Sequence, residues 1–161
     1  GARGASQYGA LDAFLPAVLA LAGDIDRASR LQKSGLMMWR LHGIEPEALD
    51  YRKMEVVSGG YQLRPEIIES AYYLHHFTGD LRWRAMGREF FDDFVRNCRT
   101  DTAYAAIKDV RTMEKRDSME SFVLAETFKY YWLLFSPPSA LEFDGVVFNT
   151  EAHPLRRTWK D

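Results

Sequence analysis

Residues 65–80 read PEIIESAYYLHHFTGD, and this stretch decides the fold. Pro65 suits the first position of a helix, and Glu66 adds a negative charge to the first turn, so the sequence predicts that a helix begins here. Gly79-Asp80 ends it, because glycine readily takes the left-handed conformation that follows a helix. The residues between are apolar nearly all round, which is typical of a helix buried on every side.

The same pattern of helix, stop and helix occurs earlier in the chain. Gly23-Asp24 lies 56 positions before Gly79-Asp80 and follows an apolar helix predicted over 11–21. Each stop precedes a more charged helix, predicted over 25–39 and 81–98. A period of this size, built of two helices, indicates stacked helical hairpins. We therefore predict an all-α fold, an arc of an α/α toroid whose inner helices are covered by outer ones.

Two other segments complete the predicted secondary structure. Asp117-Ser-Met-Glu120 resembles a capping box and predicts a third long helix that ends near Phe135. Residues 42–61 carry glycines and a proline without helical periodicity, so we predict a loop.

The composition indicates one domain that is long enough to bury a core. Hydrophobic residues make up 47% of the 161 residues, and the formal net charge is −2. A chain without a positive field has no electrostatic attraction for nucleic acid or an anionic membrane. No apolar run reaches the length of a membrane span.

The first residues and the single cysteine bear on the parent protein. The opening Gly1-Ala2-Arg3-Gly4-Ala5 has neither an initiator methionine nor a secretory apolar region, so we expect an excised or processed piece. Cys98 has two interpretations. It is a small buried hydrophobe with a free thiol, or it pairs with a cysteine outside this chain, as a secretory parent protein would allow.

Two glutamates are candidates for chemistry. Glu66 lies in a first helical turn, where a carboxylate complements the helix dipole without any further purpose. Glu126 lies in an apolar run, where a buried and unpaired carboxylate is costly. Phe122 and Tyr130 lie four positions to either side of Glu126 and share its helix face. An aromatic plate beside a carboxylate suits a sugar, whereas a buried ion pair, with Lys129 or an arginine, is the other interpretation.

A third candidate is the stretch VFNTEAHP at 147–154. It lacks periodicity and combines the amide of Asn149, the hydroxyl of Thr150, the carboxylate of Glu151 and the imidazole of His153. Oxygen ligands of this kind suit a hard cation such as Ca²⁺, but the spacing is not that of an EF-hand loop. A polar surface loop is the alternative interpretation.

Three long blocks, in the same order, resemble glycoside hydrolase family 47, the class I α-1,2-mannosidases. The blocks are YQLRPEIIESAYYL at 61–74 with TGD at 78–80, MESFVLAETFKY at 119–130, and VFNTEAHPL at 147–155. They extend over most of the chain. On this resemblance, residues 1–161 are identified as the C-terminal part of a single catalytic domain.

The resemblance also points to one branch of the family. Residues 11–17, 41–47, 108–112 and 115–120 are most similar to the ER degradation-enhancing mannosidase-like proteins. Members of that branch trim mannose from N-glycans of misfolded glycoproteins in the endoplasmic reticulum lumen and mark them for ER-associated degradation. The implied partners are high-mannose N-glycans and, for some members, a protein disulfide isomerase.

The family's fold is a seven-hairpin α/α barrel, and its reaction is inverting hydrolysis of terminal α-1,2-linked mannose with bound Ca²⁺. By motif, Glu66 matches the general base, which activates a water across the sugar ring from the acid. Arg64 would contact the sugar, and Phe122 would be the stacking platform. These roles are what the resemblance implies.

The same resemblance implies a metal site. Glu126 and Glu151 would line the calcium and sugar site, and Thr150 would bind Ca²⁺ through its hydroxyl and carbonyl oxygens. The family's general acid lies N-terminal to the residues present here, so we predict that this segment alone does not hydrolyse glycans. A lectin-like protein that binds mannose glycans without turnover is the alternative function.

Overall fold

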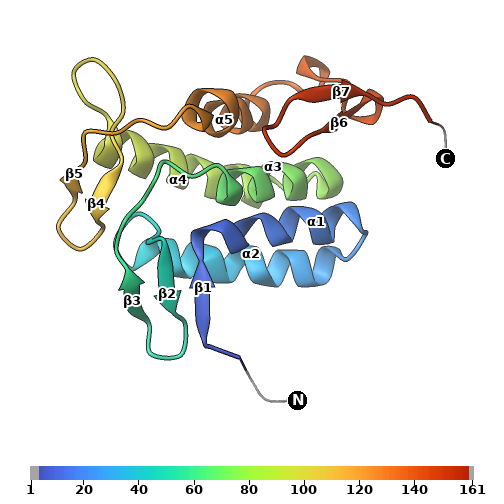
Figure 1. Cartoon of the computed structure of the whole chain (residues 1–161). Coiled ribbons are helices and arrows are strands. Elements are labelled where there is room, and N and C mark those ends of the chain that lie inside the picture. The colour runs from blue at the N-terminus through green and yellow to red at the C-terminus, as the bar shows by residue number, and fades with distance from the viewer. Residues whose placement is uncertain (1–3, 160–161) are drawn as a thin grey trace.

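The computed structural model describes residues 4–159 (Figure 1). Gly1, Ala2 and Arg3, on which the expectation of a processed start partly rests, lie outside the described residues. The main helices, in chain order, are η1 (Ala10–Phe14), α1 (Leu15–Leu21), α2 (Ile25–Arg40), α3 (Glu66–Thr78), α4 (Leu81–Cys98), η2 (Val123–Thr127) and α5 (Phe128–Phe135). The predicted helices therefore exist, and α4 has the predicted bounds.

The helices stack as hairpins, as the repeat predicts. Both stops adopt left-handed glycine geometry, with φ of 81° at Gly23 and 65° at Gly79. The following aspartates cap the next helix, because Asp24 accepts the backbone N–H of Arg27 and Asp80 that of Arg82. The sequence thus encodes each reversal locally, with a glycine to end one helix and an aspartate to begin the next.

The hairpins form two layers (Figure 1). Helix α3 contacts α1 on one side and α5 on the other, while α2 and α4 pack outside them. Seven of the thirteen residues of α3 are buried, so the prediction of an inner helix buried on every side is confirmed for it. Helix α1 buries Pro16, Ala17 and Ala20 but exposes Leu15, Val18 and Leu21, so one of its faces has no covering helix among residues 4–159.

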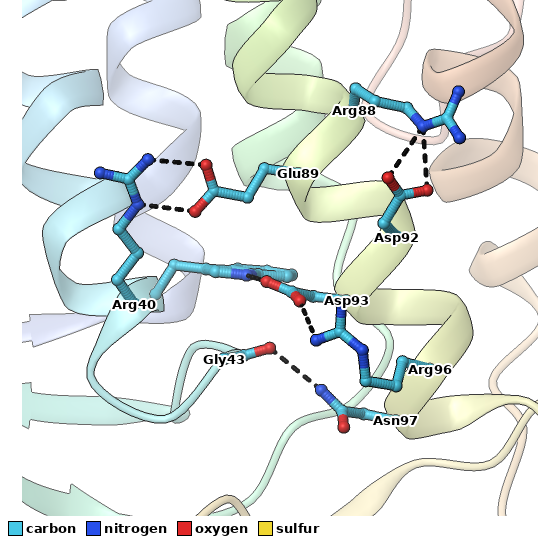
Figure 2. A network of polar contacts seen from close by, with 9 residues as sticks. Arg40, Gly43, Arg88, Glu89, Asp92, Asp93, Arg96 and Asn97 are labelled. Atoms are coloured by element: carbon cyan, nitrogen blue, oxygen red, sulfur yellow. Dashed lines mark hydrogen bonds and ion pairs between the residues drawn. The ribbon is translucent and has the colours of Figure 1, made fainter.

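Polar contacts join the outer helices α2 and α4 (Figure 2). Arg40 makes a bidentate ion pair with Glu89, with distances of 2.6 and 2.7 Å. The indole N–H of Trp39 donates to buried Asp93 at 2.9 Å. Asn97 donates to the Gly43 carbonyl at 3.1 Å. These bonds fix the loop after α2 against α4.

Short strands make up the rest of the fold. A three-stranded antiparallel sheet has the order β1 (Gln7–Gly9), β2 (Ala48–Asp50) and β3 (Glu55–Ser58). Two further hairpins are formed by β4 (Ile107–Asp109) with β5 (Glu114–Lys115), and by β6 (Val146–Phe148) with β7 (Pro154–Arg156). The prediction of a plain loop over 42–61 was therefore wrong, because β2 and β3 pair with each other and β2 also pairs with β1 from the beginning of the chain.

The third predicted helix begins later than its sequence indicates. Ser118 donates its hydroxyl to Glu120 at 3.0 Å, and the Glu120 carbonyl accepts from the Val123 amide at 3.1 Å. The expected capping box is thus a turn before the helix, and η2 begins at Val123. Residues 123–127 form a π-helix, in which the amide of Phe128 bonds to the Val123 carbonyl, five residues back.

Aromatic rings hold the C-terminal segment against the helices. Phe143 stacks on His76 of α3 with ring centroids 4.0 Å apart and meets Tyr73 edge-on at 5.4 Å. Phe148 of β6 packs against Tyr130 of α5 at 6.0 Å. The β6–β7 hairpin is thereby fixed beside α3 and α5.

The remaining predictions concern a membrane span and Cys98. No helix between residues 4 and 159 has the length and apolar character needed to cross a bilayer. The Cys98 thiol is free and fully buried, and its burial raises its pKa to about 12. The side chain of Cys98 is therefore buried as the first interpretation expects, and pairing with a cysteine outside this chain stays the alternative.

Candidate functional site

The turn before α3 brings the predicted base and its arginine into the centre of the fold. Leu63 takes the left-handed conformation, with φ of 61°, although it is fully buried. The chain then turns through Arg64 and Pro65, and Glu66 is the first residue of α3. The helix start holds the Glu66 carboxylate where positive helix-dipole charge is concentrated.

Arg64 is oriented from two sides. It makes a bidentate ion pair with Glu47, with distances of 3.2 and 2.8 Å, which raises the pKa of the guanidinium. Its guanidinium carbon also lies 5.8 Å from the centre of the Phe122 ring, a cation–π distance. The predicted sugar contact and the predicted stacking platform are therefore neighbours.

Glu66 has the properties of a base that works near neutrality. Burial raises the pKa of its carboxyl to about 7, with Arg64 opposing the shift and Glu69 and Glu47 adding to it. Its Oε2 atom is buried and has no hydrogen-bond partner among residues 4–159. A buried, unpaired carboxylate oxygen needs a partner that the described chain does not supply.

Glu126 lies in the π-helix and faces other carboxylates rather than a lysine. Burial raises the pKa of Glu126 to about 7, and the charges of Glu151 and Glu66 raise it further. Its carboxyl group is within hydrogen-bonding reach of Glu151, while the charge of Lys129 is the weakest influence on it. The structure thus favours a shared acidic site over the alternative of a simple buried ion pair.

The tip of the β6–β7 hairpin carries the predicted metal ligand. Thr150 and Glu151 are exposed in the loop between the strands. The side chain of Asn149 accepts the amides of Glu151 at 3.0 Å and His153 at 2.9 Å, which shapes this loop. Glu151 reaches Glu126, and Thr150 precedes Glu151 in the same loop.

Glu69 and Glu45 belong to this region but were missed by the sequence analysis. Glu69 accepts the hydroxyl of Tyr130 at 3.0 Å, and burial raises the pKa of Glu69 to about 7. Its spacing of three residues from Glu66 is the signal that places both on one helix face. Glu45 is 2% exposed, and neither of its carboxyl oxygens has a partner among residues 4–159. Burial, followed by the charges of Glu66 and Glu47, raises its pKa well above the ordinary value.

The site fits a hard cation by the chemistry of its donors. Glu66, Glu69, Glu126 and Glu151 influence one another's charges, and three of them have raised pKa values because burial and neighbouring carboxylates disfavour ionisation. A cation would relieve this repulsion. Within residues 4–159, no three Asp, Glu, His or Cys side chains form a direct ligand set, so these carboxylates do not by themselves surround a metal.

Sequence and structure comparisons identify relatives of this chain. The family described as glycosyl hydrolase family 47 matches residues 2–157. Alpha-mannosidase I MNS4 of Arabidopsis thaliana is 38% identical over 92% of this chain and 25% of its own length. Human ER degradation-enhancing alpha-mannosidase-like protein 2 is 36% identical over 92% of this chain and 29% of its own length.

A solved structure supports the same relationship. The alpha-1,2-mannosidase from Trichoderma reesei superposes with a TM-score of 0.84 at 29% identity, over 94% of this chain and 39% of that enzyme. The predicted α/α fold is confirmed as an arc of that larger architecture. The chain spans between a quarter and two fifths of these relatives. Since the family match extends over nearly all of its residues, the chain belongs to glycosyl hydrolase family 47.

Proposed function

We propose that this chain forms part of a calcium-dependent, inverting α-1,2-mannosidase that acts on terminal mannose of N-glycans. The observation that carries the proposal is the pair formed by Arg64 and Phe122, 5.8 Å apart, together with the electrostatic coupling of Arg64 to Glu66 and of Glu66 and Glu151 to Glu126. Carboxylates beside an aromatic ring and a fixed guanidinium suit a sugar, which offers hydroxyls to the polar groups and a C–H face to the ring.

Glu66 is proposed as the general base. With a pKa of about 7, its carboxylate accepts a proton from water at near-neutral pH, where a base is most effective. In an inverting reaction that water attacks the sugar across the ring from the acid, so the acid must stand apart from Glu66. Arg64 binds and orients the sugar, and Phe122 stacks against it.

Thr150 is proposed as the protein ligand of Ca²⁺, through its hydroxyl and carbonyl oxygens. When bound, Ca²⁺ supplies positive charge and oxygen-binding positions that sugar hydroxyls can fill. Glu126 and Glu151 hold water and sugar hydroxyls around that position. The absence of a direct carboxylate ligand set among residues 4–159 is compatible with this arrangement.

The wider setting is proposed from the relatives. Human endoplasmic reticulum mannosyl-oligosaccharide 1,2-alpha-mannosidase is 39% identical over 88% of this chain, and the ER degradation-enhancing proteins match at similar identity. We place the protein in the endoplasmic reticulum lumen, acting on high-mannose glycoproteins destined for degradation, with a protein disulfide isomerase as a partner. Residues 1–161 would be the C-terminal part of one catalytic domain, with the general acid outside them.

The test is mannose release from a Man9 N-glycan by the longest natural form of the protein, with and without a calcium chelator. We expect release with calcium, loss of release with the chelator, and recovery when calcium is restored. Glu66→Gln should lower kcat at least a hundredfold, because it removes a base. Glu142→Gln changes an exposed glutamate outside the site and is the matched control.

Three outcomes discriminate between the functions. The isolated 161-residue chain should release no mannose, and release by this chain would contradict the need for an acid outside it. Calcium-dependent glycan binding without any product from the longest form would favour the lectin-like alternative. Equal activity of Glu66→Gln and Glu142→Gln would exclude Glu66 as the base.

A further inference from the structure

Two buried residues other than glycine adopt the left-handed conformation directly beside the candidate site. Leu63, with φ of 61°, precedes Arg64, and Ala152, with φ of 53°, follows Glu151. Both residues are at most 1% exposed. A side chain makes this conformation unfavourable, so it persists only where the surrounding structure holds it.

One continuous helical segment, η2 followed by α5, holds both of these turns through their carbonyl groups. The Thr127 hydroxyl donates to the Leu63 carbonyl at 2.7 Å, and this bond is buried. The Lys129 ammonium donates to the Ala152 carbonyl at 2.6 Å. The two donors lie two positions apart, so a single piece of backbone fixes the turn of the base and the tip of the β6–β7 hairpin.

The segment that carries both donors begins with an unusual helical geometry. Residues 123–127 form a π-helix, a rare geometry that is frequent at functional sites. Glu126 stands next to Thr127 in the same turn, and the charges of Glu151 and Glu66 act on its carboxyl group. The π-helix therefore carries the Glu126 carboxylate, while Thr127 and Lys129 hold the turns at Leu63 and Ala152.

We propose that Thr127 and Lys129 are positioning residues, which set the placement of Glu66 and of Thr150–Glu151 relative to Glu126. Neither side chain needs to touch the sugar for this role. Each holds a left-handed turn whose neighbouring residues form the site. The catalytic readouts below rest on the proposed function, whereas the hydrogen-exchange readouts do not.

The Thr127 bond is tested by Thr127→Val, which keeps the shape and removes the hydroxyl, in the longest natural form of the protein. We expect kcat for mannose release to fall about tenfold to a hundredfold, since small misplacements of catalytic groups have effects of this size. Hydrogen–deuterium exchange should quicken at the amides of 61–66. Thr127→Ser keeps a hydroxyl and should restore both properties.

Thr78→Val is the matched control. The Thr78 hydroxyl also donates to a backbone carbonyl, that of Leu74 at 2.6 Å, but at the opposite end of α3 from Glu66. If the role of Thr127 is purely structural, Thr127→Val and Thr78→Val should both lose stability. The two variants should then have the same kcat and the same hydrogen exchange at the amides of 61–66. That result would overturn the proposal for Thr127.

The Lys129 bond provides a second test that does not depend on a buried substitution. Lys129→Met should weaken the binding of Ca²⁺ alone, measured by calorimetry, at least tenfold and should quicken exchange at the amides of 149–153. Lys108→Met, which removes a lysine from the exposed pair with Glu114, should change neither property. This arm decides the proposal if Thr127→Val does not fold.

The readouts separate the two hypotheses. If the unmodified protein releases no mannose, the proposed function fails, yet local exchange at 61–66 and 149–153 still tests the positioning role. If mannose is released but the variants match their controls in exchange, calcium affinity and kcat, the positioning role is wrong and the proposed function stands.

Discussion

At the scale of single residues, the site is a set of carboxyl groups whose surroundings disfavour ionisation. Glu66, Glu69 and Glu126 each have a pKa near 7 because burial removes water from the charged form. Glu45 is buried more deeply, with neither oxygen bonded within residues 4–159. These residues differ in their partners, and their variants should therefore differ in their effects.

Glu45→Gln should make stability less sensitive to pH. The folded-state pKa of Glu45 is raised, so the unfolded chain releases the proton more readily and the unmodified protein loses stability as the pH rises above the ordinary carboxyl value. The advantage of the variant should grow with pH until the folded-state pKa is passed. Urea unfolding from pH 4.5 to 8 measures this. Parallel curves for the variant and the unmodified protein would contradict the assignment.

Tyr130→Phe should destabilise the fold by about 1.5–3 kcal/mol, the usual worth of a hydrogen bond to a charged group. It removes the donor to Glu69, whose pKa that hydrogen bond lowers, so the pKa of Glu69 should rise further. Tyr72→Phe is the control, since its hydroxyl has no hydrogen-bond partner within residues 4–159. Chemical denaturation compares the two, and equal losses would show that the Glu69 bond contributes nothing.

At the scale of helices, close approach depends on a glycine in α4. A Cβ atom at Gly87 would meet Leu134 of α5 at 2.2 Å and Ile68 of α3 at 3.0 Å. The side chains of these two inner helices therefore leave no room for a Cβ atom at Gly87. No pattern in the sequence marks this contact, because it depends on two helices that are distant along the chain.

Gly87→Ala should lower the free energy of unfolding by about 1–3 kcal/mol, since overpacking outweighs the better helix propensity of alanine. Gly35→Ala, in the interior of α2, meets Ile67 and Tyr8 only at ordinary contact distances of 3.6 and 3.7 Å. We expect that control variant to be neutral or stabilising by up to about 1 kcal/mol. Thermal unfolding separates the two, and similar effects would contradict the close approach at Gly87.

At the scale of the whole molecule, the arc has an open side at α1. Leu11, Leu15, Val18 and Leu21 are between 40% and 56% exposed, and the chain spans 39% of the solved relative. A contiguous apolar surface of this kind favours association in an isolated chain. In a longer protein we expect it to be covered.

Val18→Ser should have one effect on the isolated chain and a different effect on the longest natural form of the protein. It should reduce self-association of the isolated chain in sedimentation velocity, because it breaks the apolar surface. In the longest natural form it should lower the melting temperature, because it buries a hydroxyl. Leu155→Ser changes a residue of similar exposure on β7 and should do neither. Destabilisation of the isolated chain alone would contradict a covered α1.

The helix reversals and the main site residues were predictable because their signals are local. Gly23-Asp24 and Gly79-Asp80 each combine a glycine that ends one helix with an aspartate that caps the next. The three motif blocks contain Glu66, Glu126 and Thr150. The paired strands within 42–61 were missed, because strands of three and four residues carry little pattern of their own and β2 also depends on β1, about forty residues earlier in the chain. Glu45 was missed for a similar reason: only tertiary packing removes its carboxyl from water.

In the π-helix, the number of residues matters as well as their identity. Residues 123–127 contain one residue more than an α-helical path between the same points requires, as the bond from Phe128 to Val123 records. Deleting a single residue there would let an α-helical path join the same two points, so the helix on either side could stay in place while the side chains within 123–127 would shift and turn. The wide turn that carries Glu126 next to Thr127 would then be lost, even if every remaining residue were unchanged. Insertions and deletions should therefore be excluded from this one turn.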